Sequence, residues 1–256
     1  MAKKESLSDK QKFVVEHFTK LIEKYDSEHA GVALSDLIRD EILKHTEKGQ
    51  SIFKEIEEIS DEYKVQFGEF EDMFGEYITA KGLLDGDKGQ ILTPYQIVDY
   101  MCKSTLELTY KVSELNTGDK EGQKPISEAS NILDPACGTG RFMLGVAKWY
   151  HTNLHMYNFI MWNIDIDINM VNMCLMNALL YNIPAFIIHG NALIPDDIWS
   201  VWASIPVNGA KHSMFTQGSV DFVKNFLKNT IDNNKKNDDK ADKHDLFTIF
   251  KNPVEE

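Results

Sequence analysis

The chain has 256 residues, of which 43% are hydrophobic and 26% are charged, and its formal net charge is -13. This apolar fraction supports a packed core and excludes a disordered chain, while no apolar run approaches the length of a membrane span. Residues 1–12 lack the apolar stretch of a signal peptide. The three cysteines, Cys102, Cys137 and Cys174, form no Cys-x-x-Cys pair. We therefore expect no disulfide framework, no metal site and a reducing, cytoplasmic environment.

The acidic balance bears on the class of ligand. A protein that binds DNA by itself usually carries a basic balance, because phosphate backbones attract basic surfaces. With a net charge of -13, three interpretations stay open. DNA binds to a small local basic patch, a partner supplies the DNA-binding surface, or DNA is not the substrate.

Residues 1–80 are predicted to form an N-terminal helical region. Apolar side chains recur at three- and four-residue spacing over residues 13–25 and again over residues 52–74. Gly68 and Gly75 are candidate interruptions, and the stretch between the two runs, residues 26–31, is predicted to be a turn. The stripes are apolar and no basic stripe accompanies them, so we expect these helices to pack against the rest of the molecule rather than to read DNA.

Residues 81–256 are predicted to form an α/β domain. After a loop at residues 81–90, which holds three glycines, the pattern predicts a helix, a polar loop and then strands in alternation with helices. This alternation is typical of a parallel sheet with helices on both faces. The expected helices are 95–115, 141–150 and 169–181, and the expected strands are 131–134, 158–164 and 185–189.

The pattern weakens beyond residue 195. Residues 199–203 are a candidate fourth strand, and residues 220–231 are predicted to be a helix. Residues 233–244 form a mixed-charge polar run, for which we expect a flexible, solvated segment. Residues 246–250 are the last apolar piece.

The strongest motif is Asp-Pro-Ala-Cys-Gly-Thr-Gly-Arg-Phe at residues 134–142, where a predicted strand ends and a helix starts. Gly138 and Gly140 lack a Cβ atom, so the chain can turn sharply and a ligand can approach closely. The helix N-terminus offers N–H groups to a carboxylate, and Asp134 supplies a charge suited to an ammonium. Donors for a carboxylate beside an acceptor for an ammonium describe the methionine end of S-adenosylmethionine. A nucleotide phosphate is disfavoured next to Asp134, and the lysine of a P-loop is absent.

This motif resembles the cofactor loop of the N6-adenine DNA methyltransferases, particularly the modification subunit of type I restriction-modification systems. Residues 89–94, Gly-Gln-Ile-Leu-Thr-Pro, resemble the family's Thr-Pro element, which closes over the methionine moiety. The resemblance covers roughly residues 80–195 and implies a Rossmann-like class I methyltransferase fold with S-adenosylmethionine as cofactor. It implies that Thr93 and Pro94 line the cofactor pocket. The alternative is a simple helix start, with Thr93 as cap and Pro94 in the first turn.

The second predicted strand ends at Asp165, which matches the family's ribose-binding acid. A carboxylate at such a strand end commonly accepts from ribose hydroxyls, and Ile166 is expected to pack on the adenine ring. Asp167 is expected to cap the following helix. The cofactor contacts expected within the loop itself are Asp134, Ala136, Gly138, Gly140 and Phe142.

The third predicted strand leads into Asn191 and Ala192. Related enzymes usually have Asp at the Asn191 position, where it accepts from the adenine amino group of the cofactor. Asn keeps a carbonyl acceptor, so we expect Asn191 and Ala192 to contact the adenine. A turn residue is the competing interpretation of Asn191.

The sequence departs from the family after the fourth strand. N6-adenine methyltransferases carry Asn/Asp-Pro-Pro-Tyr/Phe there, which polarises the adenine amine and stacks on the flipped base. This chain has no such tetrad. By position the nearest candidate is residues 204–207, Ser-Ile-Pro-Val, in which Ser204 and Pro206 are the weak catalytic candidates.

Three functions stay open. The first, which the resemblance favours, is an adenine-specific DNA methyltransferase of unusual or reduced form, with DNA as substrate and a specificity or other partner subunit. The second is a degenerate S-adenosylmethionine-binding subunit with a regulatory or decoy role, which the missing tetrad favours. The third is a methyltransferase for another substrate, because fold alone does not fix function. The sequence defines neither the oligomeric state nor the partner.

Overall fold

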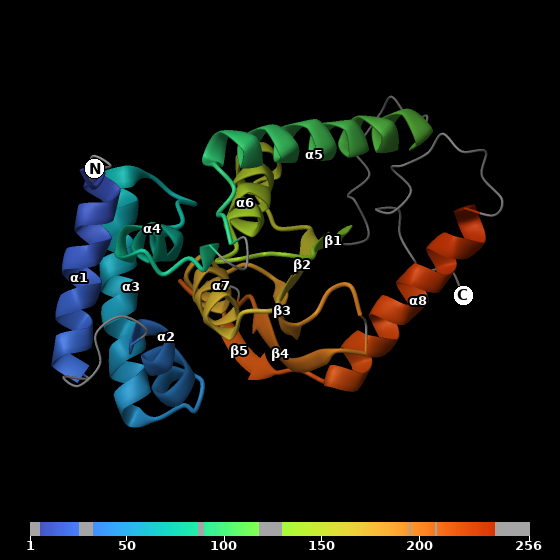
Figure 1. Cartoon of the computed structure of the whole chain (residues 1–256). Coiled ribbons are helices and arrows are strands. Elements are labelled where there is room, and N and C mark those ends of the chain that lie inside the picture. The colour runs from blue at the N-terminus through green and yellow to red at the C-terminus, as the bar shows by residue number, and fades with distance from the viewer. Residues whose placement is uncertain are drawn as a thin grey trace.

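The computed structural model describes residues 6–25, 33–86, 90–117, 130–194, 196–207 and 209–238. The first eighty residues are mostly helical where described, as predicted, and Figure 1 shows these helices gathered on one side of the sheet. The predicted turn at residues 26–31 and the apolar piece at residues 246–250 lie outside the described residues. The helices of this region are α1 (Asp9–Tyr25), α2 (Ala33–Leu37), the π-helical turn η1 (Ile38–Ile42), α3 (Glu47–Phe67) and α4 (Met73–Lys81).

Local chemistry explains where α3 begins and ends. The hydroxyl oxygen of Thr46 accepts a hydrogen bond from the Gly49 N–H at 2.8 Å, which caps the helix. A Cβ atom on Gly49 would lie 2.1 Å from the Glu41 carbonyl oxygen, so glycine is required for α3 to approach η1 this closely. The helix ends at Gly68, whose φ of 103° lies outside the range that other residues favour. Gly68 is therefore an interruption, as predicted, whereas Gly75 lies inside the first turn of α4.

The centre of the molecule is a five-stranded sheet in the order β1-β2-β3-β4-β5. The first three strands are parallel, and β4 and β5 run antiparallel to their neighbours. The predicted α/β alternation is confirmed for the first three strands, but the sheet is not parallel throughout. The strands are β1 (Ser130–Asp134), β2 (Phe159–Asp165), β3 (Ala185–Gly190), β4 (Ile198–Ile205) and β5 (Met214–Gln217).

Helices cover both faces of the sheet, and the side chains of β2 alternate between them. Phe159 and Met161 belong to the core on the side of the N-terminal helices, whereas Trp162 and Ile164 belong to a second cluster with α8. The Trp162 ring stacks on Phe226 of α8 with centroids 3.9 Å apart. The covering helices are α5 (Tyr95–Thr117), α6 (Arg141–Leu154), α7 (Ile168–Leu180) and α8 (Val220–Asp238).

Helix α8 is longer than the pattern predicted. It continues to Asp238 and so includes the first part of the polar run at residues 233–244, for which a flexible segment was expected. Residues 239–244 lie outside the described residues. The helical periodicity of charged residues on a solvated helix is weak, which is why the sequence placed its end too early.

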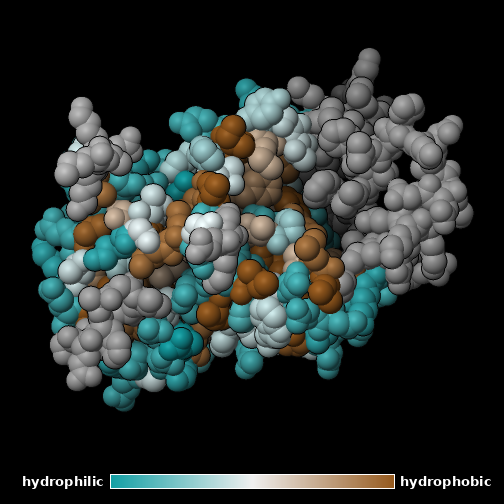
Figure 2. All heavy atoms as spheres, viewed as in Figure 1, coloured by the Kyte–Doolittle hydropathy of each residue, from teal (hydrophilic) through white to brown (hydrophobic). Residues whose placement is uncertain are grey.

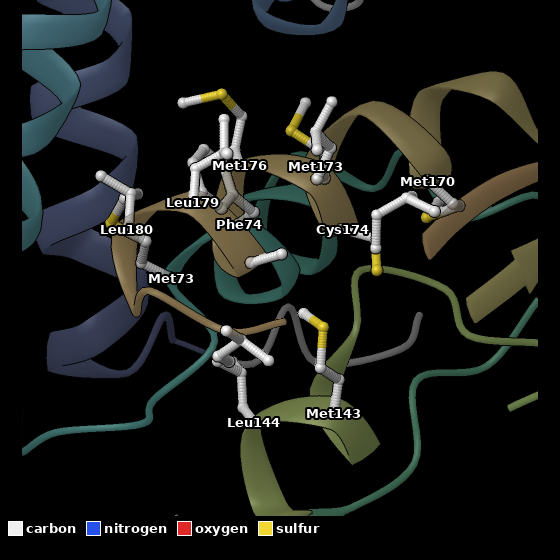
Figure 3. Close-up of a cluster of buried hydrophobic side chains, with 14 of the residues drawn as sticks. Met73, Phe74, Met143, Leu144, Met170, Met173, Cys174, Met176, Leu179 and Leu180 are labelled. Carbon is white, nitrogen blue, oxygen red and sulfur yellow. The ribbon is translucent and has the colours of Figure 1, made fainter. Parts of the chain in front are cut away.

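The N-terminal helices and the sheet share one hydrophobic core. A single cluster of buried residues runs from Phe13 in α1 to Ile187 in β3. Figure 3 shows the part of it where residues of α4, α6 and α7 meet, including Phe74, Leu144 and Met176. The division into residues 1–80 and 81–256 therefore stays a prediction. None of the described helices is long and apolar enough to cross a membrane.

Candidate cofactor site

Three strand ends bring the predicted site residues to one edge of the sheet. Because β1, β2 and β3 are parallel neighbours, their carboxyl ends at Asp134, Asp165 and Gly190 lie at the same edge. In open α/β sheets, ligands bind at this edge. The structure thus places residues from three separate stretches of the sequence around one location.

The glycine-rich loop after β1 turns back over the end of β2. The Cys137 N–H donates to the Ile164 carbonyl at 2.9 Å, and the Gly138 N–H donates to Asp165 Oδ2 at 2.8 Å. Gly138 has a φ of 54° and Gly140 a φ of 88°. A Cβ atom on Gly140 would also lie 2.8 Å from the Cys174 sulfur. Both glycines are therefore needed for the turn that starts α6, as their position in the motif predicts.

Asp134 is half-buried at the start of this loop. Its Oδ1 accepts from the Ala136 N–H at 3.3 Å. Burial raises the pKa of the Asp134 carboxyl to about 6, and the nearby Asp165 adds to the rise. A cationic ligand would stabilise the charged form of this carboxylate, because a nearby positive charge offsets the cost of desolvation.

Asp165 is held by two backbone donors. Its Oδ1 accepts from the Asp167 N–H at 2.9 Å, and its other oxygen accepts from Gly138. Each carboxylate oxygen has a second lone pair, so further donors remain acceptable. Asp167 accepts from the Asn169 N–H and caps α7, as predicted. Ile166, between Asp165 and Asp167 in the sequence, has a side chain that is 57% exposed.

The Thr-Pro element lies against the glycine-rich loop. A Cβ atom on Gly138 would come within 3.2 Å of the Leu92 side chain, and the Gln90 amide donates to Asp167 Oδ2 at 2.8 Å. Thr93 and Pro94 come directly before α5, and the Pro94 carbonyl accepts from the first turn of that helix. The element therefore both begins a helix and stands beside the predicted cofactor loop.

The remaining cofactor candidates occupy the rim of this edge. Asn191 Oδ1 accepts from the Leu193 N–H at 3.1 Å, which is the turn geometry of the competing interpretation. Ala192 packs against the core cluster that includes α8, and Phe142 packs against the core on the other face. Ala136 is exposed in the loop.

Ser204 and Pro206 do not join this group. Ser204 pairs with Ala185, the first residue of β3, so it lies at the opposite end of the sheet from Gly190. Its hydroxyl is buried and donates to the Ile183 carbonyl at 2.8 Å. The sequence hypothesis assumed a fourth strand that ends beside the first three. Because β4 is antiparallel, its carboxyl end points away, and neither residue is carried further as a catalytic candidate.

Sequence reasoning missed a buried polar cluster behind the site, centred on Asp72 and Arg141. Asp72 is fully buried, and Arg141, the first residue of α6, contacts it through Nε at 3.2 Å. The signal for Asp72 was its position three residues before Gly75, whose N–H it caps. Arg141 stands in the recognised motif, but nothing local gives its partner, which is 69 residues away.

The chemistry of the described side chains gives no metal centre: no group of three or more His, Cys, Asp or Glu among them is placed to hold a metal ion. The site offers carboxylates, backbone N–H groups and apolar surface, which suit an organic ligand. Figure 2 shows hydrophobic residues in the middle of the face of the molecule that is seen in Figure 1. Large apolar side chains that are more than half exposed include Ile91, Ile166, Leu193 and Ile194.

Comparison with known families agrees with this geometry. The family model described as N-6 DNA Methylase matches residues 66–240, more than half of the chain. The chain belongs to the N-6 DNA methylase family. The match begins within α3 and ends after α8, so it includes the glycine-rich loop, both acids and the sheet.

One solved structure that the chain is similar to comes from Listeria monocytogenes and is described as a class I S-adenosylmethionine-dependent methyltransferase. The identity is 19%, the TM-score is 0.33, and the match covers 66% of this chain and 50% of that one. This chain therefore spans about half the length of that protein. No relative was found among curated proteins.

The family identifies S-adenosylmethionine as the cofactor, and the residues present fit it. Asp134 is a half-buried carboxylate without a cationic partner among the contacts of the described residues, which suits an ammonium. The first turn of α6 presents the free N–H groups of a helix start, which suit a carboxylate. Asp165 at the adjacent strand end is placed for ribose hydroxyls. The expected fold and cofactor are thereby confirmed, whereas the individual contacts stay predictions.

Proposed function

We propose that this chain binds S-adenosylmethionine as part of an adenine-N6 DNA methyltransferase of the restriction-modification kind. The observation that carries the proposal is the convergence at one sheet edge of the glycine-rich loop, Asp134 and Asp165, with the Thr-Pro element against the loop. Membership of the N-6 DNA methylase family supports DNA adenine as the substrate. A cytoplasmic location belongs to the same proposal, in keeping with three free, buried cysteines.

In this proposal the residues divide the cofactor between them. Asp134 holds the ammonium, the α6 N-terminus holds the carboxylate, and Asp165 accepts from the ribose. Ile166 supplies apolar surface for the adenine, and the Asn191 amide accepts from its amino group through the lone pair that Leu193 leaves free. When bound, S-adenosylmethionine supplies an electrophilic methyl group on its sulfonium. The protein's contribution is to fix the direction in which that methyl group points.

The substrate half of the reaction needs groups that the described site does not contain. Adenine amine is a poor nucleophile, so acceptors must polarise its N–H bonds and a ring must hold the flipped base. The sequence has no Asn/Asp-Pro-Pro-Tyr/Phe, and residues 204–207 lie at the far end of the sheet. We propose that a partner subunit contributes the ring, the acceptors and a basic groove, which the net charge of -13 also calls for.

Cofactor binding is tested by calorimetry with the intact chain. We expect S-adenosylmethionine to bind, and Asp165→Asn to weaken binding by about 1–3 kcal/mol, because a buried ribose hydroxyl would lose its charged acceptor. Asp61→Asn is the matched control, since it makes the same change of side chain on α3, where Asp61 pairs with Lys211. Absence of binding by the folded wild-type chain would refute the proposal.

Methyl transfer is tested by single turnover with labelled cofactor and unmethylated DNA at low salt. We expect the chain alone to be slow or inactive, because loss of positioned polar groups typically costs a hundredfold or more in rate. Loss of a stacking ring adds about 1–3 kcal/mol. Addition of a co-encoded partner should restore formation of N6-methyladenine. Efficient turnover by the chain alone would show that an atypical active site suffices.

The second candidate function is a degenerate cofactor-binding subunit. The missing tetrad favours it. Tight cofactor binding without methyl transfer in the presence of every co-encoded partner would establish this function instead. Transfer of label to protein rather than DNA would indicate a different substrate class.

A further inference from the structure

The carboxylate of Asp72 lies wholly inside the protein and accepts four hydrogen bonds. Oδ1 accepts from the Gly75 N–H and from the Asn177 amide, both at 2.9 Å. Oδ2 accepts from the Thr139 hydroxyl at 2.5 Å and from Arg141 Nε at 3.2 Å. The side chain of Asp72 has no exposed surface. One carboxylate thus joins α4, α6, α7 and the glycine-rich loop.

Arg141 extends this cluster to the Thr-Pro element. Its Nη1 donates to the Thr93 carbonyl at 3.2 Å, and its Nη2 lies 3.4 Å from Glu76 Oε1. The guanidinium also lies over the Tyr95 ring, 4.2 Å from the centroid. Burial opposes the positive charge, but Asp72, Tyr95 and Glu76 together raise the pKa of Arg141, so it stays charged.

These contacts connect the two segments that flank the cofactor site. Thr139 belongs to the glycine-rich loop and Thr93 to the Thr-Pro element, and neither segment is a helix or a strand at that point. The Asn177 amide adds a second hydrogen bond to the Thr139 carbonyl at 2.8 Å. Side-chain packing of Leu92 and the Gln90–Asp167 hydrogen bond also hold the element against the loop.

Stability alone does not explain a charged pair at this position. A buried ion pair is often no more stabilising than well-packed apolar residues of similar volume. The surrounding part of the core is apolar, as Figure 3 shows for Met73, Phe74, Met143 and Leu144. An ion pair with fixed hydrogen-bond directions does what apolar packing does not, because it sets the orientation of the groups that it joins.

We propose that Asp72 and Arg141 are positioning residues that hold the Thr-Pro element and the glycine-rich loop in register for the methionine end of the cofactor. The proposal rests on the proposed function, in that the site takes S-adenosylmethionine. Arg141 donates to the Thr93 carbonyl and to Asp72, which in turn accepts from Thr139, so one planar group sets the spacing between the two segments. The adenosine end, at Asp165 and Asn191, lies outside the cluster.

The principal variant is Arg141→Lys, which keeps the charge and loses the planar set of donors. By calorimetry we expect the affinity for S-adenosylmethionine to fall at least tenfold and the affinity for adenosine to change less than twofold. Asn172→Ala is the matched control, because the Asn172 amide on α7 also joins the N-terminal helices to the core, through Ser35 at 3.0 Å, and is not a member of the Asp72 cluster. The control should lower the melting temperature without changing the ratio of the two affinities.

A second measurement needs no ligand. Amide hydrogen exchange of free Arg141→Lys should be faster than wild type at residues 90–97 and 137–143, and unchanged in α1. Asp72→Asn should do the same if it folds. Equal loss of affinity for S-adenosylmethionine and adenosine, or unchanged exchange in both segments, would overturn the positioning role. If wild type binds no S-adenosylmethionine while the exchange result holds, the proposed function fails and the structural coupling stands.

Discussion

At the scale of single residues, burial and hydrogen bonding decide the chemistry of the site. Asp134 and Asp165 end neighbouring strands, yet they differ. Burial raises the pKa of Asp134 to about 6, whereas Asp165 accepts from two backbone N–H groups. Desolvation disfavours the charged form of a carboxylate. The charge of Asp134 therefore depends on pH near neutrality.

Asp134 should make both stability and cofactor affinity depend on pH. Its pKa is about 6 in the folded chain and about 3.9 when unfolded. The unfolded state thus loses its proton first, and the free energy of unfolding should fall as pH rises from about 4 to about 6. Cofactor affinity should rise over pH 5 to 7, because the carboxylate form binds the ammonium.

Calorimetry and urea unfolding of wild type and Asp134→Asn check this expectation. In the variant, the fall in the free energy of unfolding and the rise in cofactor affinity that Asp134 causes should both disappear. The stability of the variant at pH 7 should exceed that of wild type. Parallel profiles in the two proteins would show that another group titrates.

Ser204 should matter for stability and not for the cofactor. Its buried hydroxyl donates to the Ile183 carbonyl, so Ser204→Ala should cost about 0.5–1.5 kcal/mol of stability. Because β4 places it opposite Ala185, the affinity for S-adenosylmethionine should not change. Urea titration and calorimetry on the same preparation measure both. A large loss of affinity at unchanged stability would return Ser204 to the site.

At the scale of elements, close approach and strand direction decide the arrangement. The contact of α3 with η1 requires glycine at position 49, where a Cβ atom would lie 2.1 Å from the Glu41 carbonyl oxygen. The connection between β4 and β5 contacts α3, since the Lys211 ammonium of this connection lies 3.3 Å from Glu57 of α3. Neither contact can be inferred from the periodicity of one segment.

Gly49→Ala should destabilise the protein although alanine is the better helix former. The gain in helix propensity is about 1 kcal/mol, whereas overpacking costs about 1–3 kcal/mol and more when backbone atoms must move. Gln50→Ala, at the exposed neighbouring position, is the control and should change stability by less than about 0.5 kcal/mol. Thermal unfolding followed by circular dichroism measures both. Equal melting temperatures would mean that α3 and η1 separate at no cost.

At the scale of the whole molecule, one core joins the N-terminal helices to the sheet. Buried residues from Phe13 to Ile187 form a single cluster. The Lys64 ammonium of α3 donates to the Leu180 carbonyl at the end of α7. Two separate folding units would each need a core of their own, so the shared cluster favours one cooperative unit.

The chain should therefore unfold in one transition. Trp162, Trp199 and Trp202 lie in strands and Trp149 lies on α6, so all four tryptophans are outside α1 to α4. Much of the far-ultraviolet circular dichroism comes from α1 to α4. Urea curves followed by tryptophan fluorescence and by circular dichroism should coincide. Two separated midpoints would support a boundary near residue 80 and independent unfolding of the helices.

The sequence by itself determined the fold class, the cofactor and the loop that begins its site. These depend on local requirements. Gly138 and Gly140 must adopt positive φ, Asp167 must cap a helix, and the nearly continuous apolar run of β2 needs cover on both faces. Such requirements are visible within a few residues of chain, which is why the motif at residues 134–142 could be recognised.

Only the tertiary structure decided which distant groups meet. The antiparallel direction of β4 moved Ser204 away from the site, and no local pattern encodes the direction of a strand relative to its neighbour. The partners of Asp72 lie up to 105 residues away. A buried carboxylate must find donors wherever packing supplies them, so the cluster that joins Thr93 to Thr139 is a property of the packed chain and not of any segment.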